Sequence, residues 1–469
     1  MSEVFGVLIL AAGKGTRMKS DLPKVLHPVR EVPMLGWVLD TADSLGPAWT
    51  ITVIGAGAEK VQDRFRNRGR FVLQEPQLGS GHAVMQAVPL LEGEAGDVLV
   101  LMGDVPLLRR QTLEALLSEH RASGAACTVL TAVPPEPGAY GRVIRDDYGN
   151  VRAIREARDA NEAERSVREI NTGIYAFAVT PLCRHIRQLK ADNAQGEYYL
   201  TDLVEIFHAV GLKVRAFQVG DHREVAGINH RGDLADAERE LGRRINREWM
   251  LAGVTMLDPE RTDIGPAVRL EPEVVLHPGV TLRGATTVAR GCEILPGSWL
   301  ENTVLEADVR VEFSVVRDSV IRARTTVGPF AHLRGGAVIG PSNRIGNFVE
   351  IKKTTTGAGT KASHLTYLGD ATVGAEVNVG AGTITCNYDG VRKNPTVIED
   401  GAFIGSDSIL VAPVTVGRGA YTAAGSTVTR DVPADALAVG RAHQTTVEGW
   451  AARRRQKLAQ EKAAKGEKE

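Results

Sequence analysis

The chain has 469 residues, a formal net charge of −1 and 24% charged residues. Because this length exceeds what one ordinary hydrophobic core holds, two or three domains are expected. The near-zero net charge argues against a general nucleic-acid-binding surface. Glycine is frequent, with 50 residues, and aromatic residues make up only 5%. This bias indicates a turn-rich region whose core is filled by small aliphatic side chains.

The four cysteines, Cys127, Cys183, Cys292 and Cys386, lie far apart and form no CxxC pair. Neither a disulfide framework nor a zinc site is expected, and a reducing compartment fits best. The apolar run near the N-terminus is too short to span a membrane and lacks a basic flank. No other segment resembles a membrane span, so the sequence predicts a cytoplasmic protein.

The first half of the chain alternates short apolar runs with helical patterns. Buried strands are predicted at 7–10, 51–54, 98–102 and 128–131, and amphipathic helices at 34–45 and 111–120. Strands that alternate with helices imply right-handed crossovers and an α/β fold with a mostly parallel sheet. Ligands of such sheets bind beyond the carboxyl ends of the strands. We therefore expect the chemistry in the loops after the first and fourth strands.

A six-residue rhythm of aliphatic residues begins at Ile264 and continues, with register shifts, to Val428. A period of six fits neither a single helix nor a single strand. It does fit a parallel β-helix, in which each hexad forms one short strand and a corner, and three hexads close a coil. Glycine often follows the aliphatic residue, where it tolerates the corner dihedrals and the crowding. The span predicts about nine coils, and so many aligned positions argue against the alternative, a β-sandwich.

The hexads are expected to lapse twice. Residues 354–360 read TTTGAGT, and residues 386–396, CNYDGVRKNPT, form a loop that leaves the coil. Loops outside a solenoid often carry function. The predicted divisions are a first domain at 1–229, a connecting helix at 230–252, a β-helix domain at 253–445 and a polar, basic, mobile tail at 446–469.

The first predicted strand leads into a glycine-rich segment, LAAGKGTRM, at 10–18. Two glycines let backbone N–H groups approach phosphates closely, and Arg17 and Lys24 can neutralise their charge. The segment is neither a Walker A loop nor a dinucleotide fingerprint, because the further glycines of those motifs are missing. A glycine-rich turn with surface cations is the alternative interpretation of this segment alone.

This segment resembles the signature of the sugar-nucleotide pyrophosphorylases, LxAAGxGTRM…PK. The resemblance continues through QEPQLGSGH at 74–82, GDVP at 103–106, YGR at 140–142, Glu156, INTG at 170–173 and GIN at 227–229. In order and spacing these motifs are similar to those of the bacterial bifunctional family of N-acetylglucosamine-1-phosphate uridyltransferase and glucosamine-1-phosphate N-acetyltransferase. The resemblance runs from about residue 4 to residue 441 and implies a Rossmann-like nucleotidyltransferase domain.

The resemblance also implies the residues of a first site, in which a sugar 1-phosphate attacks the α-phosphorus of UTP and expels pyrophosphate. The uridine would be held by Ala12, Gly13, Gln74, Gln77, Gly79 and Ser80, and the sugar by Gly141, Glu156 and Asn171. The substrate-binding set is completed by Leu10, Ala11, Lys24, Met102, Gly103, Asp104 and Asn229. His82 is interpreted as structural. Ser80 stands where the family is expected to have threonine, and Met102 where an aromatic residue is common.

Mg²⁺ is the cofactor that the resemblance implies, bound by Asp104 and Asn229. One carboxylate and one amide suffice for a cation that keeps several waters and bridges phosphates. The attacking phosphate oxygen is already anionic, so the reaction needs charge neutralisation and alignment rather than a general base. Arg17 and Lys24 are the predicted catalytic cations.

A second site is implied on the β-helix, which resembles left-handed β-helix acyltransferases that use acetyl-CoA. The segments EIKK at 350–353, KASHLTYLGD at 361–370 and GTITCNYDG at 382–390 match the bifunctional family. Histidine suits deprotonation of an amine near neutral pH, so His364 is the predicted general base, oriented by Glu350. Cys386 is interpreted as structural. The other predicted residues are Arg334 and Lys352 for the sugar phosphate, Tyr367 and Asn378 for the sugar, and Ala381, Asn387, Tyr388, Ser406, Ala424 and Arg441 for acetyl-CoA.

The resemblance finally implies a homotrimer with active sites at the subunit seams, for which closed cyclic symmetry is the physical expectation. The predicted partners are the small-molecule substrates alone, with no nucleic acid and no membrane. The product would be UDP-N-acetylglucosamine, a precursor for the cell wall. Two alternatives stay open from the sequence: a nucleotidyltransferase with a purely structural or regulatory β-helix, and a non-catalytic scaffold.

Overall fold

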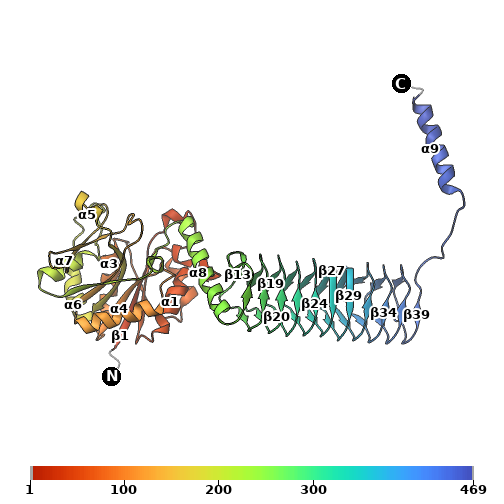
Figure 1. The fold of residues 1–469 in the computed structure, drawn as a ribbon, viewed down its shortest axis with the longest axis horizontal. Coiled ribbons are helices and arrows are strands. Elements are labelled where there is room, and N and C mark those ends of the chain that lie inside the picture. Colours follow the sequence, from red (N-terminus) through yellow and green to blue (C-terminus); the bar gives the residue numbers. More distant parts are fainter. Residues whose placement is uncertain (1–3, 467–469) are drawn as a thin grey trace. The chain divides into compact units, whose positions relative to one another are not determined.

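The structure is a computed structural model that describes residues 4–466. The chain divides into two compact units, Met1–Arg247 and Glu248–Glu469. The first unit holds a sheet with helices, and the second holds a long stack of short strands (Figure 1). No helix in the described part of the chain is long and apolar enough to cross a membrane.

The sheet of the first unit follows the order β11-β7-β10-β6-β1-β4-β5, with β8 and β9 attached to β10. Only β10 runs against its neighbours on this path, so the predicted mostly parallel sheet is confirmed. The strands are β1 Phe5–Ala11, β4 Thr50–Ile54, β5 Arg70–Leu73, β6 Asp97–Met102, β7 Cys127–Ala132, β8 Arg142–Arg145, β9 Val151–Arg155, β10 Ile170–Ala178 and β11 Val214–Gln218.

Helices cover both faces of this sheet because successive strand residues point to opposite sides. Leu8 and Leu10 of β1 belong to the core beneath α3, α6 and α7, whereas Val7 and Ile9 belong to the core beneath α1, α2 and α4. The four predicted strands and both predicted helices are all present. The helices are α1 Met34–Ser44, α2 Ala58–Phe65, α3 Ser80–Leu91, α4 Arg110–Ser123, α5 Glu162–Ser166, α6 Val179–His185 and α7 Asp202–Ala209.

Helix α8, Arg231–Leu251, lies where the sequence predicted a helix at 230–252. Its residues Ala237 and Leu241 pack with Val29, Met34 and Ile228 in a small core of the first unit. The two compact units divide at Arg247, inside this helix. The predicted domain boundaries at residues 229, 252 and 445 stay predictions.

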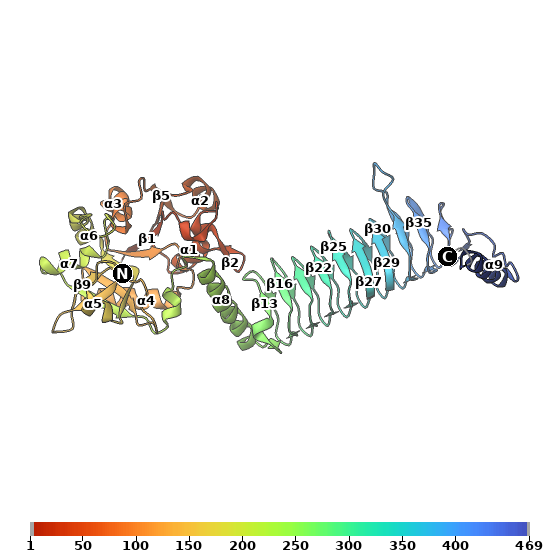
Figure 2. The ribbon, with the colours of Figure 1, turned by 90° about the horizontal axis from the view of Figure 1, so that it is seen from above.

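The second unit is a parallel β-helix, as the six-residue rhythm predicted (Figures 1 and 2). Each short strand pairs in parallel with the strand one coil later, so that Ile321 of β23 (Val320–Ile321) lies beside Ile339 of β26 (Val338–Ile339). A nine-stranded sheet and a 19-stranded sheet form the walls. The nine strands of the smaller sheet, one per coil, agree with the nine predicted coils.

Glycine follows the inward aliphatic residue mainly because of crowding. A Cβ at Gly340 would lie 2.3 Å from the carbonyl oxygen of Gly357, and one at Gly346 would lie 2.0 Å from that of Ser363. Neither glycine has a positive φ; the left-handed backbone is found at other corner positions, several of which carry bulky side chains such as Phe330 and Phe348. Close approach of the next coil therefore explains Gly340 and Gly346, as the expected crowding predicted, whereas the expected corner dihedral is found at Gly328, which has φ 107°.

The predicted lapse at 354–360 is also wrong. Strand β28, Thr355–Thr356, continues the smaller sheet between β26 and β30 (Ala371–Val373). Thr356 takes the inward position of an aliphatic residue and is buried. Its hydroxyl accepts hydrogen bonds from the Gly340 N–H, at 2.9 Å, and from Asn343 Nδ2, at 2.5 Å. A hydrogen-bonded polar layer thus replaces an apolar one without breaking the coil.

The second predicted break is confirmed. A loop lies between β32 (Ile384–Cys386) and β33 (Thr396–Ile398) and projects from the coils between the labels β30 and β35 in Figure 2. Within the predicted tail, residues Trp450–Gly466 form helix α9, which the sequence analysis did not predict, and the mobility of the tail stays a prediction. The side chains at 450–463 are exposed, and alanine, lysine, glutamine and arginine favour helix without a packed face.

The polar layer at Thr356 gives a first test. We expect Thr356→Val to destabilise the chain by about 3 kcal/mol, because the buried Gly340 N–H and Asn343 amide lose their acceptor. The measurement is thermal unfolding of the full chain. Thr372→Val is the matched control: Thr372 is exposed on the next coil, in register with Thr355, and should change stability by less than about 0.5 kcal/mol. Equal melting temperatures for the two variants would contradict the conclusion that the Thr356 hydroxyl stabilises this polar layer.

Candidate active sites

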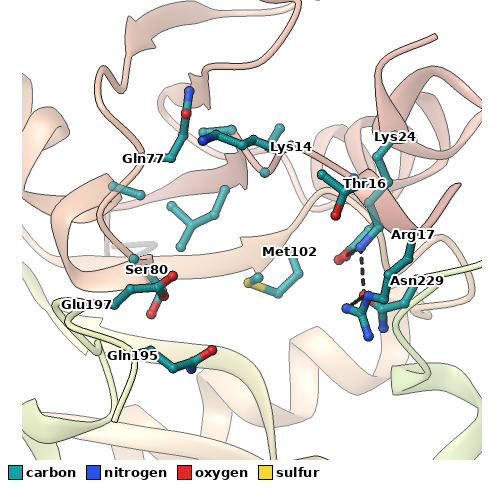
Figure 3. A pocket seen from close by; sticks show the side chains of 18 of the residues that line it. Lys14, Thr16, Arg17, Lys24, Gln77, Ser80, Met102, Gln195, Glu197 and Asn229 are labelled. Carbon is teal, nitrogen blue, oxygen red and sulfur yellow. Dashed lines mark hydrogen bonds and ion pairs between the residues drawn. The ribbon is translucent and has the colours of Figure 1, made fainter. Parts of the chain in front are cut away.

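A cavity of about 780 Å³ lies at the carboxyl ends of β1 and β6 (Figure 3). The predicted residues that line it are Leu10, Ala11, Ala12, Gly13, Arg17, Lys24, Gln74, Gln77, Gly79, Ser80, Met102, Asp104, Glu156 and Asn229. Of the two loops expected to hold the chemistry, the one after β1 does line the cavity. The loop after β7, the fourth predicted strand, supplies only Ala139, whereas the loop after β6 supplies Asp104.

Three predicted residues, Gly103, Gly141 and Asn171, are not among the residues that line the cavity. The Gly103 N–H donates to the Leu10 carbonyl at 2.9 Å, which joins the ends of β6 and β1. The Asn171 N–H donates to the Gly141 carbonyl at 2.8 Å. A Cβ at Gly141 would lie 3.4 Å from Glu156 Oε1. These residues shape the wall in this structure, and their substrate contacts stay predictions.

The two glycines of the 10–18 segment have different tasks. Gly15 has φ 61°, and a Cβ there would lie 2.6 Å from Lys24 Cβ, so glycine lets Lys24 approach this loop. A Cβ at Gly13 would meet nothing within 4 Å. Packing therefore does not require glycine at position 13, and the open space beside it is available to a ligand that contacts the backbone.

A cluster of charged and amide groups lies at one part of the cavity (Figure 3). Lys24 Nζ donates to Asp104 Oδ2 at 2.5 Å and to Asn229 Oδ1 at 2.9 Å, and Arg17 Nη2 donates to the same Asn229 oxygen at 2.7 Å. The Ile228 N–H donates to the Asp104 carbonyl at 3.0 Å, which holds the loop of Asn229 against the loop of Asp104. Two oxygens, 125 residues apart in sequence, thus converge on one cationic group.

These two oxygens fit a magnesium ion that is completed by other ligands. Among the described residues no group of three or more His, Cys, Asp or Glu side chains could hold a metal, so a cage made of protein alone is not present there. Mg²⁺ usually takes one or two protein oxygens and completes its shell with water and phosphate. The Lys24 ammonium marks the position where Asp104 and Asn229 jointly hold positive charge.

The QEPQLGSGH segment is held by contacts that explain its glycines. A Cβ at Gly79 would lie 2.7 Å from the Tyr198 carbonyl oxygen, and one at Gly81 would lie 2.4 Å from Leu189. Ser80 Oγ accepts a hydrogen bond from the Leu200 N–H at 3.1 Å. Because a hydroxyl is all that this contact needs, serine can replace the expected threonine.

The segment at 193–200, which packs on these glycines, carries residues that the sequence reasoning missed. Gln195 and Glu197 line the cavity (Figure 3). The Tyr198 N–H donates to the Leu78 carbonyl at 2.8 Å, and the Gly81 N–H to the Tyr198 carbonyl at 2.7 Å. No motif in the sequence indicated this segment, since its role depends on backbone contacts between residues about 120 positions apart.

Carboxylates gather beside Glu156. Burial raises the pKa of Glu156, and the neighbouring Asp202, Asp159 and Glu197 raise it further. Burial also raises the pKa of Asp202, to about 6, with a contribution from Glu205. The carboxyl oxygens of Glu156, which lines the cavity, can accept hydrogen bonds from sugar hydroxyl groups.

A second group of predicted residues lies on the β-helix, on strands β27 (Arg344–Lys352) and β29 (Lys361–Gly369). His364 is exposed, and its Nδ1 lies 2.6 Å from Asn347 Oδ1. An amide oxygen accepts, so Nδ1 carries the proton and Nε2 keeps its lone pair. The geometry therefore leaves His364 Nε2 able to take a proton from a substrate.

The expectation that Glu350 orients His364 is contradicted. Glu350 Oε1 accepts from Arg334 Nε at 2.9 Å and from Nη2 at 2.6 Å. The register between coils explains the difference, because Asn347 lies directly beside His364 whereas Glu350 lies beside Tyr367. Asn347 was missed, although its position 17 residues before His364, one coil length, is the signal that could have identified it.

The projecting loop brings a further cation to this region. Asn387 Nδ2 donates to Asp370 Oδ2 at 2.5 Å, and Lys393 Nζ lies 3.8 Å from the same oxygen. The side chain of Lys393 contacts Lys352 and lowers the pKa of that ammonium. Two neighbouring cations favour an anion between or beside them. Lys393 and Asp370 were not among the predicted site residues, although the loop itself was singled out.

Three of the residues predicted to bind acetyl-CoA, Ala381, Ser406 and Ala424, share one edge of the coils with His364. The N–H groups of Gly382, Asp407 and Gly425 donate to the carbonyls of Leu365, Ala381 and Ser406, at 2.8, 2.7 and 2.8 Å. The residues preceding these donors are Ala381, Ser406 and Ala424, which therefore follow His364 one coil apart. Arg441 lies at the end, where its Cδ is 3.8 Å from a Cβ built on Gly425. An extended ligand could lie along this edge.

The fold and the two sites define a nucleotidyltransferase joined to a hexapeptide acyltransferase. Residues 7–196 match the MobA-like NTP transferase domain, and residues 318–353 and 395–430 match the bacterial transferase hexapeptide family of six repeats. The match to this family also identifies the coils as the left-handed β-helix that the sequence predicted.

Curated relatives match both halves together. The bifunctional protein GlmU of Pelobacter propionicus is 50% identical over 458 residues, which is 97% of this chain and 100% of the relative. Those of Geobacillus thermodenitrificans and a Nostoc species are each 50% identical and cover 96% and 95% of this chain and 98% of their own lengths. The chain belongs to the GlmU family. Its two predicted activities, uridyl transfer and acetyl transfer, are thereby confirmed, and neither alternative is supported.

The raised pKa of Asp202 gives a prediction for stability. The folded chain keeps a proton on Asp202 between pH 3.8 and about 6 that the unfolded chain has lost, so stability falls as pH rises through this window. Asp202→Asn should therefore be more stable than the wild type above pH 6, by about 1 kcal/mol after allowance for partial exposure, and equal to it near pH 4. Thermal unfolding at several pH values measures this, and a pH-independent difference would contradict it.

Proposed function

We propose that the first cavity transfers UMP from UTP to N-acetylglucosamine 1-phosphate. The convergence of Lys24, Arg17, Asp104 and Asn229 carries this assignment, since a pyrophosphate-releasing reaction needs positive charge around several phosphates. The sugar-phosphate oxygen attacks the α-phosphorus, and the bond to the departing pyrophosphate breaks in line. Lys24 and Arg17 hold the phosphates and offset the developing charge, and no side chain has to remove a proton.

We propose Mg²⁺ as the cofactor of this reaction, held by Asp104 and Asn229. When bound, the ion would neutralise the phosphate oxygens and align them for in-line displacement. Lys24, which bridges the same two oxygens in this structure, would then turn to the phosphates. The uridine is assigned to Gln74, Gln77 and the backbone at Ala12 and Gly13.

The second site is proposed to transfer the acetyl group from acetyl-CoA to glucosamine 1-phosphate. His364 Nε2 takes a proton from the ammonium or from the attacking amine, the nitrogen bonds to the thioester carbonyl, and the CoA thiolate leaves. Asn347 holds the imidazole through Nδ1. The transfer is direct, so Cys386, although exposed, has no role as a nucleophile.

Cations near the projecting loop would bind the sugar phosphate. Arg334, Lys352 and Lys393 supply the positive charge, and Tyr367 and Asn387 lie beside them. We assign acetyl-CoA to the edge that runs from His364 through Ala381, Ser406 and Ala424. Tyr388 and Asn378 complete the predicted set. The observation that carries the assignment is the alignment of this edge with the open Nε2 of His364.

We further propose a homotrimer whose seam follows the same edge. Phe313, Phe330, Phe348 and Leu365 stack one coil apart at this corner and are 43%, 55%, 56% and 61% exposed. Neighbouring phenylalanine rings are stacked with centroids 5.7 Å apart, and their planes are inclined by 28° and 9°. Such an aromatic ridge is costly to leave in water, and a second copy would cover it while reaching the adjacent His364.

A cytoplasmic location is proposed as well. It is supported by the four free cysteines of the described residues, which suit a reducing compartment. The expected substrates, UTP and acetyl-CoA, are metabolites of that compartment.

The independence of the two sites can be tested with two variants. His364→Ala should abolish acetyl transfer, because the imidazole that accepts the proton is lost, and leave uridyl transfer intact. Asp104→Ala should have the opposite selectivity, because one oxygen of the cation site is lost. The measurements are CoA release and pyrophosphate release on the purified variants. Loss of both activities in a folded variant would contradict independent sites, and acetylation at the native rate in His364→Ala would remove that residue from its role.

The trimer can be tested by sedimentation. The wild type should sediment at three times the protomer mass, and Phe330→Asp should shift toward the protomer, because a carboxylate in the middle of the ridge would be buried without a partner. Acetyl transfer should be lost with the seam, while uridyl transfer remains. Tyr148→Asp is the control, since Tyr148 is 91% exposed in the first unit. A wild type that sediments as a protomer, or a Phe330→Asp variant that stays trimeric, would contradict the seam.

A further inference from the structure

His82 lies next to the predicted uridine contact and was interpreted from the sequence as structural. It belongs to the first turn of α3, and its ring lies between the side chains of Gln74 and Gln86. Gln74 is buried and lines the cavity. The contacts among these three residues determine which atom of the Gln74 amide faces the ligand.

The Gly79 carbonyl fixes the orientation of the Gln74 amide. A carbonyl oxygen can only accept, so the amide atom 2.9 Å from it is Nε2. The same Nε2 lies 3.2 Å from His82 Nδ1. Both hydrogens of the amide nitrogen therefore have acceptors within the protein, and Oε1 remains for the ligand.

This arrangement also fixes the tautomer of His82. Nδ1 must carry the lone pair to accept from Gln74, so the ring proton is on Nε2. The Gln86 amide atom placed 3.0 Å from that Nε2 is its nitrogen, and two N–H donors cannot face each other, so this amide has to be turned by 180°. Because Nε2 donates, Gln86 presents its oxygen there. A chain of hydrogen bonds thus runs from Gln86 through His82 to Gln74.

We propose that His82 is a positioning residue that makes the site select uracil against cytosine. An amide oxygen can accept from the N3–H of uracil, whereas N3 of cytosine is itself an acceptor and would face that oxygen without a proton. Sites built around a fixed hydrogen-bonding group discriminate strongly against a base that cannot complete the bond. This inference rests on the proposed uridyl transfer and on Gln74 as the base contact.

The test is the ratio of kcat/KM for UTP to that for CTP, measured by pyrophosphate release with N-acetylglucosamine 1-phosphate. His82→Leu removes one of the two acceptors that hold Gln74, so the amide can reorient, and the ratio should fall about tenfold or more. His82→Asp offers only acceptor atoms and should keep the ratio near the native value. The negative charge that aspartate adds should change kcat/KM for UTP and for CTP by the same factor, because the two nucleotides carry the same triphosphate.

Acetyl transfer by the same full-length variants, together with thermal unfolding, shows that they are folded. A native UTP-to-CTP ratio in folded His82→Leu would overturn the inference and leave His82 structural, and loss of selectivity in His82→Asp equal to that in His82→Leu would also overturn it. Failure of the wild type to release pyrophosphate from UTP would instead contradict the proposed uridyl transfer. The two failures are therefore distinguishable.

Discussion

The backbone hydrogen bonds between successive coils are the constraint on which the second half of the molecule depends. In most of the β-helix, each residue lies beside the residue 17 or 18 positions earlier. Residues at this spacing therefore form columns that run along the stack of coils. His364 lies beside Asn347 for this reason. The same register stacks Phe313, Phe330 and Phe348 at one corner. The same spacing thus determines the position of a site residue and of a candidate subunit contact. An insertion such as the projecting loop interrupts this spacing.

The first half depends on a different constraint: charged side chains from distant segments meet at the carboxyl ends of neighbouring parallel strands. Lys24, Asp104 and Asn229 come from three distant segments and meet because strands β1 and β6 are neighbours. In this structure the Lys24 ammonium and the oxygens of Asp104 and Asn229 are hydrogen-bonded to one another. A polyphosphate with its metal ion would exchange these internal contacts for contacts to the ligand, which preorganises the site at little cost in reorganisation. The proposed base-binding end is built differently, from neutral amide and carbonyl groups, and we propose that the directions of these groups, rather than charges, select the base.

Much of this architecture could be predicted from the sequence, because its periodicities are local. Strands of buried aliphatic residues, the six-residue rhythm and the glycine-rich loop each indicate their structures directly. The errors have a common cause in contacts between distant residues. Thr354–Thr360 looked like a break because a buried threonine is acceptable only when Asn343, on the previous coil, shares its hydrogen bonds. Glu350 looked like the partner of His364, but the register places Asn347 beside His364, and the Glu350 carboxylate accepts hydrogen bonds from Arg334. Gln195 and Glu197 carried no signal, since only packing against Gly79 and Gly81 brings their segment to the cavity.

One chain supplies the catalytic residues of two chemically distinct transfer sites. The most direct measurement follows both products of the purified wild-type protein: free CoA formed from acetyl-CoA and glucosamine 1-phosphate, and pyrophosphate formed from UTP and N-acetylglucosamine 1-phosphate with Mg²⁺. The account predicts that each reaction proceeds alone and that together they convert glucosamine 1-phosphate into UDP-N-acetylglucosamine. Pyrophosphate release without any CoA release would show that the β-helix is not catalytic and would contradict the account.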